Sequence, residues 1–234
     1  MTVSRTLFFS LPLLALVACS NDSDVSDNST SISSASKAAQ SCLAKYADSP
    51  CKLLSVDLVE PYAPDGQELV HTEQDMAGMQ CSYSWEGPRT KTVGSGSFKM
   101  DVPVNDVVEL SQIEPNGDRE LDIVARQFAY RYQQTQEQKT AAAEQASERA
   151  AEAVGEEHAD MARDFAKSLM TKMQFEQIQG VGDDAAWGGI GSMKTVTVRV
   201  GKTTFSVNVA RSDDEAVRKK ESTELAKRIL DKCS

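Results

Sequence analysis

The chain contains 234 residues, of which 40% are hydrophobic, and its formal net charge is -10. These values predict one ordinary globular domain with an acidic surface. They disfavour nucleic acid as a partner, and also direct adhesion of the domain to anionic lipid, because both need a basic patch.

Residues 1–18 have the pattern of a lipoprotein signal peptide. A start that carries Arg5 is followed by an apolar segment, residues 7–17, and by small residues before Cys19. The segment is too short for a transmembrane helix, which needs about twenty apolar residues. Residues 16–19 have the sequence LVAC and resemble a lipobox, so Cys19 is the predicted lipidation site. The alternative is an ordinary secretory signal with a chance cysteine.

Residues 19–36 predict a disordered tether. The stretch SNDSDVSDNSTSISSAS lacks aromatic residues and has little to bury, and as a coil it spans roughly 20 to 25 Å. Two or more acyl chains such as palmitate on Cys19 would make the anchor durable. Ser20 is not the aspartate that favours inner-membrane retention in lipoproteins of two-membrane bacteria. We therefore expect the cell envelope, on the periplasmic side of the outer membrane if the cell has one.

Four further cysteines, Cys42, Cys51, Cys81 and Cys233, predict two disulfide bonds in an oxidising compartment. Three pairings are open, and the sequence does not choose among them. We favour Cys51 with Cys81, which would join an opening helix to a strand, and Cys42 with Cys233, which would join the two ends of the domain. A metal or redox site is the weaker interpretation, because no pair has C-x-x-C spacing.

The folded domain is predicted over residues 37–234. A helix is expected from Lys37 to the Asp48-Ser49-Pro50 stop, and a short second helix follows, with Ser55 as its cap and an apolar side of leucines and valines. Residues 81–85 and 98–104 alternate in polarity and predict an antiparallel pair of strands. The connection GPRTKTVGSGS predicts a mobile hairpin loop.

A long polar helical insertion is predicted over about 118–178. Met161, Phe165, Leu169 and Met173 lie four residues apart and would form a stripe on one face. We prefer a stripe that faces the core, and the alternative is a docking face for a partner. Residues 139–157 have almost nothing to bury and predict a projecting, solvated helix or helical hairpin.

The last third of the domain predicts a β-hairpin and a closing helix. Val196, Val198 and Val200 alternate before a Gly201-Lys202 turn, and Phe205, Val207 and Val209 alternate after it. The preceding glycines lack the spacing of a phosphate-binding loop. Asp183 and Asp184 could bind calcium, but a turn that leads Trp187 into the core is preferred. Ser212 to Glu215 has capping-box spacing, and Val217, Leu225, Ile229 and Leu230 would form the buried side of the final helix.

Several of these segments together resemble a family of lipoproteins common in actinobacteria. They are PCKLLS from Pro50, CSYSW from Cys81, GVGDDAAW from Gly180 and the VRVGKTTFSVNV hairpin. The resemblance implies a PsbP-like α+β fold, an antiparallel sheet flanked by helices, and a Cys51–Cys81 bridge. It implies no catalytic residue, cofactor or metal. The second bridge, Cys42–Cys233, departs from the family pattern, as does the enlarged helical segment.

The sequence favours a non-enzymatic envelope lipoprotein that binds either an envelope protein partner, through the helical segment, or a small apolar ligand. A hydrolase of envelope polymer is the alternative, and a purely structural component is the third hypothesis. No oriented nucleophile and base are apparent, since His71 and His158 are each predicted to be surface residues.

Overall fold

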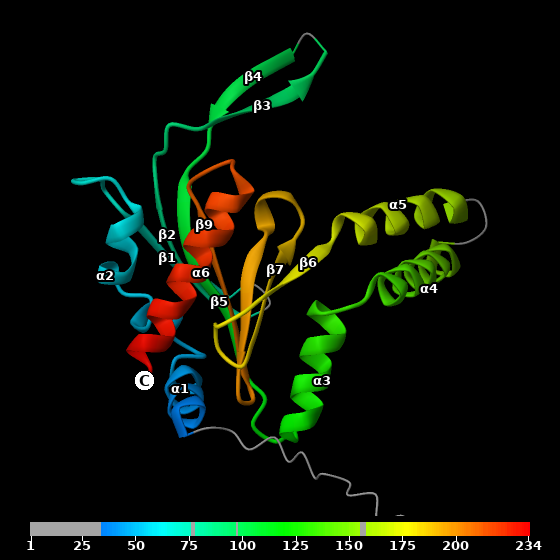
Figure 1. Ribbon diagram of the computed structural model, residues 1–234. Helices are drawn as coiled ribbons and strands as arrows, with labels where there is room; N and C mark the ends of the chain where they lie inside the picture. Colours follow the sequence, from blue (N-terminus) through cyan, green and yellow to red (C-terminus); the bar gives the residue numbers. More distant parts are fainter. Residues whose placement is uncertain (1–33, 76–77, 97, 155–157) are drawn as a thin grey trace, which may run out of the picture.

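The computed structural model describes residues 34–75, 78–96, 98–154 and 158–234 (Figure 1). The predicted signal peptide, Cys19 and most of the predicted tether lie outside the described residues. The first helix begins at Ser34, three residues before the predicted start of the domain.

The protein has the predicted α+β fold. Its main sheet is antiparallel and has seven strands in the order β1-β2-β5-β9-β8-β7-β6. These strands are β1 (Val70–Asp75), β2 (Met79–Trp85), β5 (Asp106–Pro115), β6 (Gln174–Ile178), β7 (Asp184–Gly189), β8 (Thr195–Val200) and β9 (Thr203–Ala210). A separate hairpin contains β3 (Thr90–Ser95) and β4 (Phe98–Pro103). The α-helices are α1 (Ser34–Lys45), α2 (Val56–Val59), α3 (Leu121–Tyr132), α4 (Gln136–Val154), α5 (Ala159–Lys172) and α6 (Glu215–Lys232), with short 3-10 helices at Pro50–Lys52, Glu60–Tyr62 and Gly191–Met193.

One face of the main sheet is apolar and forms the core. The predicted hairpin is confirmed as β8 and β9, and its alternating valines together with Phe205 are buried on this face. Helices α1 and α6 contact the central strands, where Leu43, Leu225 and Ile229 are fully buried. Trp187 is also in the core, as predicted from the turn before it. Because successive side chains of a strand point to opposite faces, the residues between these buried ones lie on the other face of the sheet.

The opposite face of the sheet is polar. Thr197 and Ser206 lie between core residues on β8 and β9, and their hydroxyl groups are 3.0 Å apart. Helix α3 lies over this part of the sheet, where it buries Val124 and Phe128. The rest of the polar face is open, and together with Thr197 and Ser206 it forms the floor of the site described below.

Two disulfide bonds close the core, Cys42–Cys233 and Cys51–Cys81. This is the pairing favoured from the sequence. The first bond joins α1 to the end of α6, and the second joins the 3-10 helix Pro50–Lys52 to β2.

The predicted pairing of residues 81–85 with residues 98–104 is wrong. Strand β2 pairs with β1 and β5, whereas β4 pairs with β3, which contains most of the predicted mobile loop. Strand β4 belongs to a hairpin that projects from the body (Figure 1). Its apolar side chains Phe98 and Met100 are therefore exposed and do not enter the core. Cys81, Tyr83 and Trp85 do share the buried face of β2, as predicted.

The helical segment contains α3, α4 and α5 and then β6, a strand that the sequence did not predict. Helices α4 and α5 pack against each other and project from the body, as predicted for the part of residues 139–157 that the structure describes (Figure 1). The preferred core-facing position of the α5 stripe is wrong, because Met161 and Phe165 are 72% and 69% exposed. The arm extends past the sheet, so these side chains have no core to enter.

Two helix caps differ from their predictions. Asp214, rather than Ser212, caps α6, because its Oδ1 accepts hydrogen bonds from the N–H groups of Ala216 and Val217. Ser55 precedes α2, but its hydroxyl donates to the carboxylate of Asp57 instead of accepting from the helix. Val217 is exposed, and so only the latter part of the predicted buried side of α6 packs on the sheet.

Candidate functional site

A groove of about 990 Å³ lies over the open part of the polar sheet face. We call it the sheet groove. Strands β2, β5, β8 and β9 form its floor through Gln80, Glu109, Ser111, Thr197, Ser206 and Asn208. Its rim comes from separate elements and includes Arg89, Arg131, Tyr132, Phe175, Glu215 and Arg218. The groove therefore depends on the complete tertiary fold.

Glu109 places a carboxyl group on this floor. It lies opposite Ser82 of β2 and Asn208 of β9, so its neighbours across the strands are neutral. Burial raises the pKa of Glu109, while hydrogen bonds with Ser111 and Gln80 lower it in part. No arginine or lysine in the described part of the chain forms an ion pair with Glu109. A partly buried carboxyl group without a cation is costly, and it marks a candidate site.

Other acidic groups of the rim already have partners. Arg89 binds Asp106 at 2.9 Å and Asp213 at 3.2 Å, and it also donates to the Ala210 carbonyl. Hydrogen bonds from Lys194 and Trp187 lower the pKa of Glu215. These contacts stabilise the rim, which leaves Glu109 as the carboxyl group of the groove that has no cationic partner in the described structure.

The backbone at one side of the groove is strained. Gln112 has a φ of +54°, in a left-handed conformation that non-glycine residues rarely adopt. It lies in the irregular stretch between Ser111 and Glu114, where the register of β5 against β9 shifts. Such bulges change the direction of a strand beside a site. Here the bulge brings Gln112 to the lining of the sheet groove.

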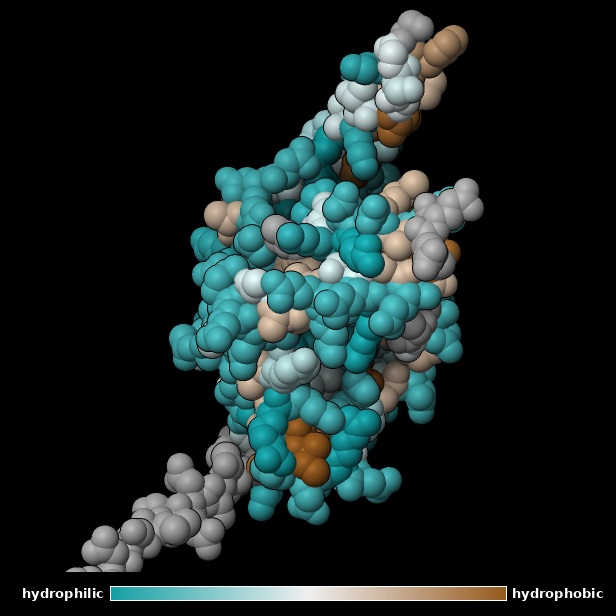
Figure 2. Space-filling model, turned by 90° about the vertical axis from the view of Figure 1, so that its right-hand side faces the viewer, coloured by the Kyte–Doolittle hydropathy of each residue, from teal (hydrophilic) through white to brown (hydrophobic). Residues whose placement is uncertain are grey.

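An apolar hollow of about 660 Å³ adjoins the sheet groove between α3 and α5. We call it the helix hollow. Its apolar lining consists of Ile123, Tyr130, Met170, Met173 and Phe175, and its polar lining includes Arg126 and Arg131. Arg131, Met173 and Phe175 line both cavities. The side of the molecule in Figure 2 shows separate hydrophobic patches surrounded by hydrophilic surface.

Aromatic contacts hold the boundary between the two cavities. The rings of Tyr132 and Phe175 meet edge to face with centroids 5.1 Å apart, and Phe128 contacts Tyr132 at 4.7 Å. Phe175 also lies against Gly188, where a Cβ would be only 2.2 Å from the phenyl ring. Glycine at 188 thus leaves room for the Phe175 ring at this boundary.

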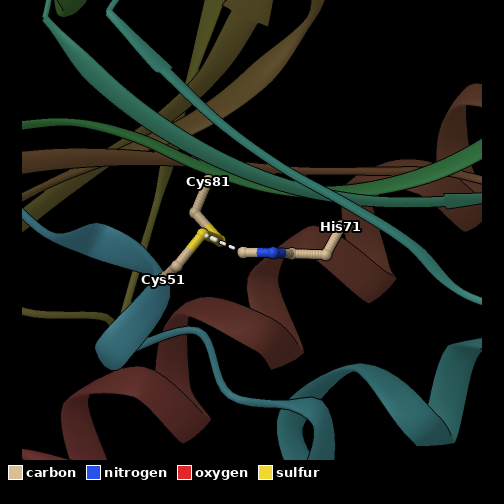
Figure 3. A group of neighbouring side chains, drawn as sticks. All are labelled: Cys51, His71 and Cys81. Carbon is tan, nitrogen blue, oxygen red and sulfur yellow. Dashed lines mark hydrogen bonds between the residues drawn. A yellow bond between two sulfur atoms is a disulfide. The ribbon is translucent and has the colours of Figure 1, made fainter.

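A second cluster brings together Cys51, His71 and Cys81 (Figure 3). His71 Nε2 lies 2.8 Å from Cys51 Sγ, and the imidazole also contacts the Tyr83 ring. These three residue types could hold zinc, but zinc binds thiolates and both sulfur atoms are in a disulfide bond. The oxidised cluster is therefore a disulfide with an imidazole beside it. His71 is exposed, as predicted, and it lies on β1.

Asp183 and Asp184, considered above for calcium, are occupied by protein contacts. Asp183 accepts a hydrogen bond of 2.6 Å from the Gly201 N–H, and Asp184 pairs with Arg199. The second predicted surface histidine, His158, is exposed beside α5 and far from these contacts in sequence. Neither aspartate is available as an open cation ligand.

Comparisons with protein-family models, curated proteins and solved structures gave no match. The resemblance to actinobacterial lipoproteins therefore stays a prediction. Among the described residues no helix has the length and apolar character needed to cross a membrane.

Glu109 is not among the residues predicted for a site, although the sequence has a signal for its strand. Val108 and Leu110 alternate with Val107, Glu109 and Ser111, as expected for a half-buried strand. The alternation predicts which face Glu109 occupies. It does not predict that α3 and the rim residues turn that face into a groove.

Proposed function

We propose that this protein is a lipid-anchored, non-enzymatic binding protein of the cell envelope whose ligand is a small molecule with an apolar part. The proposal rests on one observation, the helix hollow. Five apolar side chains line an open volume that is large enough for a small ligand. Because water would otherwise cover this apolar surface, a ligand that displaces the water gains binding free energy.

Binding of the fluorescent apolar probe N-phenyl-1-naphthylamine tests this proposal. We expect the probe to gain fluorescence with the intact domain and to lose most of that gain with Ile123→Asp, which places a charge in the helix hollow. Ile123 is 38% exposed, so the variant is expected to fold. Met161→Gln is the matched control, because Met161 lies on α5 but is not part of the hollow lining. Equal fluorescence with both variants would contradict this site.

A protein partner is the second candidate, and the exposed stripe on α5 favours it. Met161 and Phe165 are large apolar side chains on a projecting arm, where a partner could cover them. A photo-crosslinking residue at position 165 would be expected to give a discrete adduct in intact envelopes, whereas one at the exposed position 148 of α4 would not. Adducts of equal yield from both positions would contradict a specific interface.

The proposed location depends on Cys19. Two disulfide bonds support an oxidising compartment, since they are rare in reducing cytosol. Mass spectrometry is expected to find acyl chains on an N-terminal Cys19, and Cys19→Ser is expected to move the protein from the membrane to the soluble fraction. An unmodified N-terminus that retains the leader would contradict the proposal. Catalytic turnover lost with a single carboxylate substitution would instead support the hydrolase alternative.

A further inference from the structure

We propose that Glu109 binds the ammonium group of an amphiphilic amine whose apolar part occupies the helix hollow. This inference rests on the proposed function and names the chemical class of its ligand. It joins two observations, a carboxyl group without a cation on the floor of the sheet groove and an apolar hollow that shares three lining residues with that groove.

The surroundings of Glu109 are suited to an ammonium group. Its neighbours on the floor include Gln80 and Ser111, whose side-chain oxygen atoms can accept hydrogen bonds, whereas the Asn208 side-chain oxygen already accepts one from Arg218. An ammonium group has three donors, so it can bind the carboxylate and two such acceptors together. Burial already raises the pKa of Glu109, and a bound cation would favour its ionised form.

The arginines of the rim do not replace this missing cation. Arg89 is held by Asp106 and Asp213, and Arg218 donates to the Asn208 side chain and lies 5.8 Å from the Trp187 ring centre. Arg131 lies over the ring of its neighbour Tyr132, at the helix-hollow end of the groove. These cations disfavour an ammonium group near the rim, which leaves the neutral floor around Glu109 as its site.

The strand register gives the direction in which the alkyl chain of such a ligand can extend. Across the sheet the row runs from Glu109 through Asn208, Thr195 and Gly188 to Phe175, as the pairings of β5, β9, β8, β7 and β6 require. Four strand spacings separate the ends of this row, or about 19 Å. The alkyl chain of a bound amine can therefore extend from Glu109 along this row toward Phe175, which lines both the sheet groove and the helix hollow.

Calorimetric titration with decylamine, decanol and decanoate tests the inference, because these probes share one chain and differ in head group. At pH 7 and at concentrations where the probes are monomeric, we expect decylamine to bind about tenfold to a hundredfold more tightly than decanol. Glu109→Gln should remove this preference while the affinity for decanol is retained. Glu114→Gln, an exposed carboxylate of the same strand outside the sheet groove, should keep the preference.

Two outcomes would overturn the inference, and a third would also contradict the proposed function. Equal affinities for decylamine and decanol would show that Glu109 does not select an ammonium group. A preference for decanoate would show that the rim arginines select an anion. If none of the three probes bound the folded protein, the proposed function itself would fail. Circular dichroism of Glu109→Gln would verify that a lost preference does not come from unfolding.

Discussion

The backbone N–H of Val209 donates a 2.9 Å hydrogen bond to the side-chain hydroxyl of Ser222. Val207 of β9 pairs with Val196 of β8, and β8 begins only one residue earlier, at Thr195. Strand β9 therefore extends beyond the end of β8 at Val209. The N–H of Val209 therefore lacks a strand acceptor, and α6 supplies one. This contact joins the last strand to the last helix within the core.

Ser222→Ala should destabilise the protein by about 1 to 3 kcal/mol, because it leaves the buried N–H of Val209 without an acceptor. The matched control is Thr223→Ala. Within the described part of the chain, the Thr223 hydroxyl bonds only to the carbonyl of Lys219 in its own helix, so its loss should cost less. Urea denaturation of both variants measures the difference. Equal losses would contradict the role of Ser222.

Asp214→Ala should destabilise the protein by about 1 kcal/mol through loss of the α6 cap, since two N–H groups lose their acceptor. Ser212→Ala should have a smaller effect, because among the described residues the Ser212 hydroxyl accepts only from the Asp214 N–H, which lies before the helix. Thermal unfolding distinguishes the two variants. A larger loss for Ser212→Ala would support the capping box expected from the sequence and contradict the structure.

The two disulfide bonds should contribute unequally to stability. Loop-closure entropy assigns up to about 5 kcal/mol to Cys42–Cys233, with a separation of 191 residues, and up to about 3.5 kcal/mol to Cys51–Cys81, with a separation of 30. We expect a double serine variant of the first pair to lose more free energy of unfolding than a double variant of the second. The reverse order would contradict a purely entropic account.

Glu109→Gln should stabilise the unliganded protein at pH 7. The folded-state pKa of Glu109 is raised above its unfolded value, so wild-type stability falls as the pH rises through the interval between them. Glutamine cannot ionise and avoids this loss. The stability difference should disappear below about pH 4, where the glutamate of the unfolded chain is itself protonated. A variant that is less stable than wild type at pH 7 would contradict the unpaired state of Glu109.

Parts of the fold that are determined by one continuous segment could be predicted from the sequence, whereas pairings between distant strands could not. The β8–β9 hairpin was predictable, because both strands are buried on one face and a Gly201 turn joins them. Strand β1 was missed, because it is an edge strand whose side chains are mostly exposed and therefore show no alternation. The pairing of β2 with β5 was also missed, because the nearby β4 has an equally regular pattern.

The candidate site was less predictable than the fold. The α5 stripe has the same spacing whether a core, a ligand or solvent covers it, so its exposure required the tertiary structure. Glu109 lies on β5 and the helix hollow between α3 and α5, and the sequence has no signal that links them. The cysteines were informative, because their even number predicted two bonds with three possible pairings, and the favoured pairing is the one observed.

The most direct test of the proposed binding site is a methyl NMR spectrum of the protein labelled at its methionine methyl groups, recorded with and without decylamine. The account predicts that Met170 and Met173, which line the helix hollow, shift on binding, and that Met100 in the projecting β3–β4 hairpin does not. Saturable binding that leaves Met170 and Met173 unshifted would contradict the account.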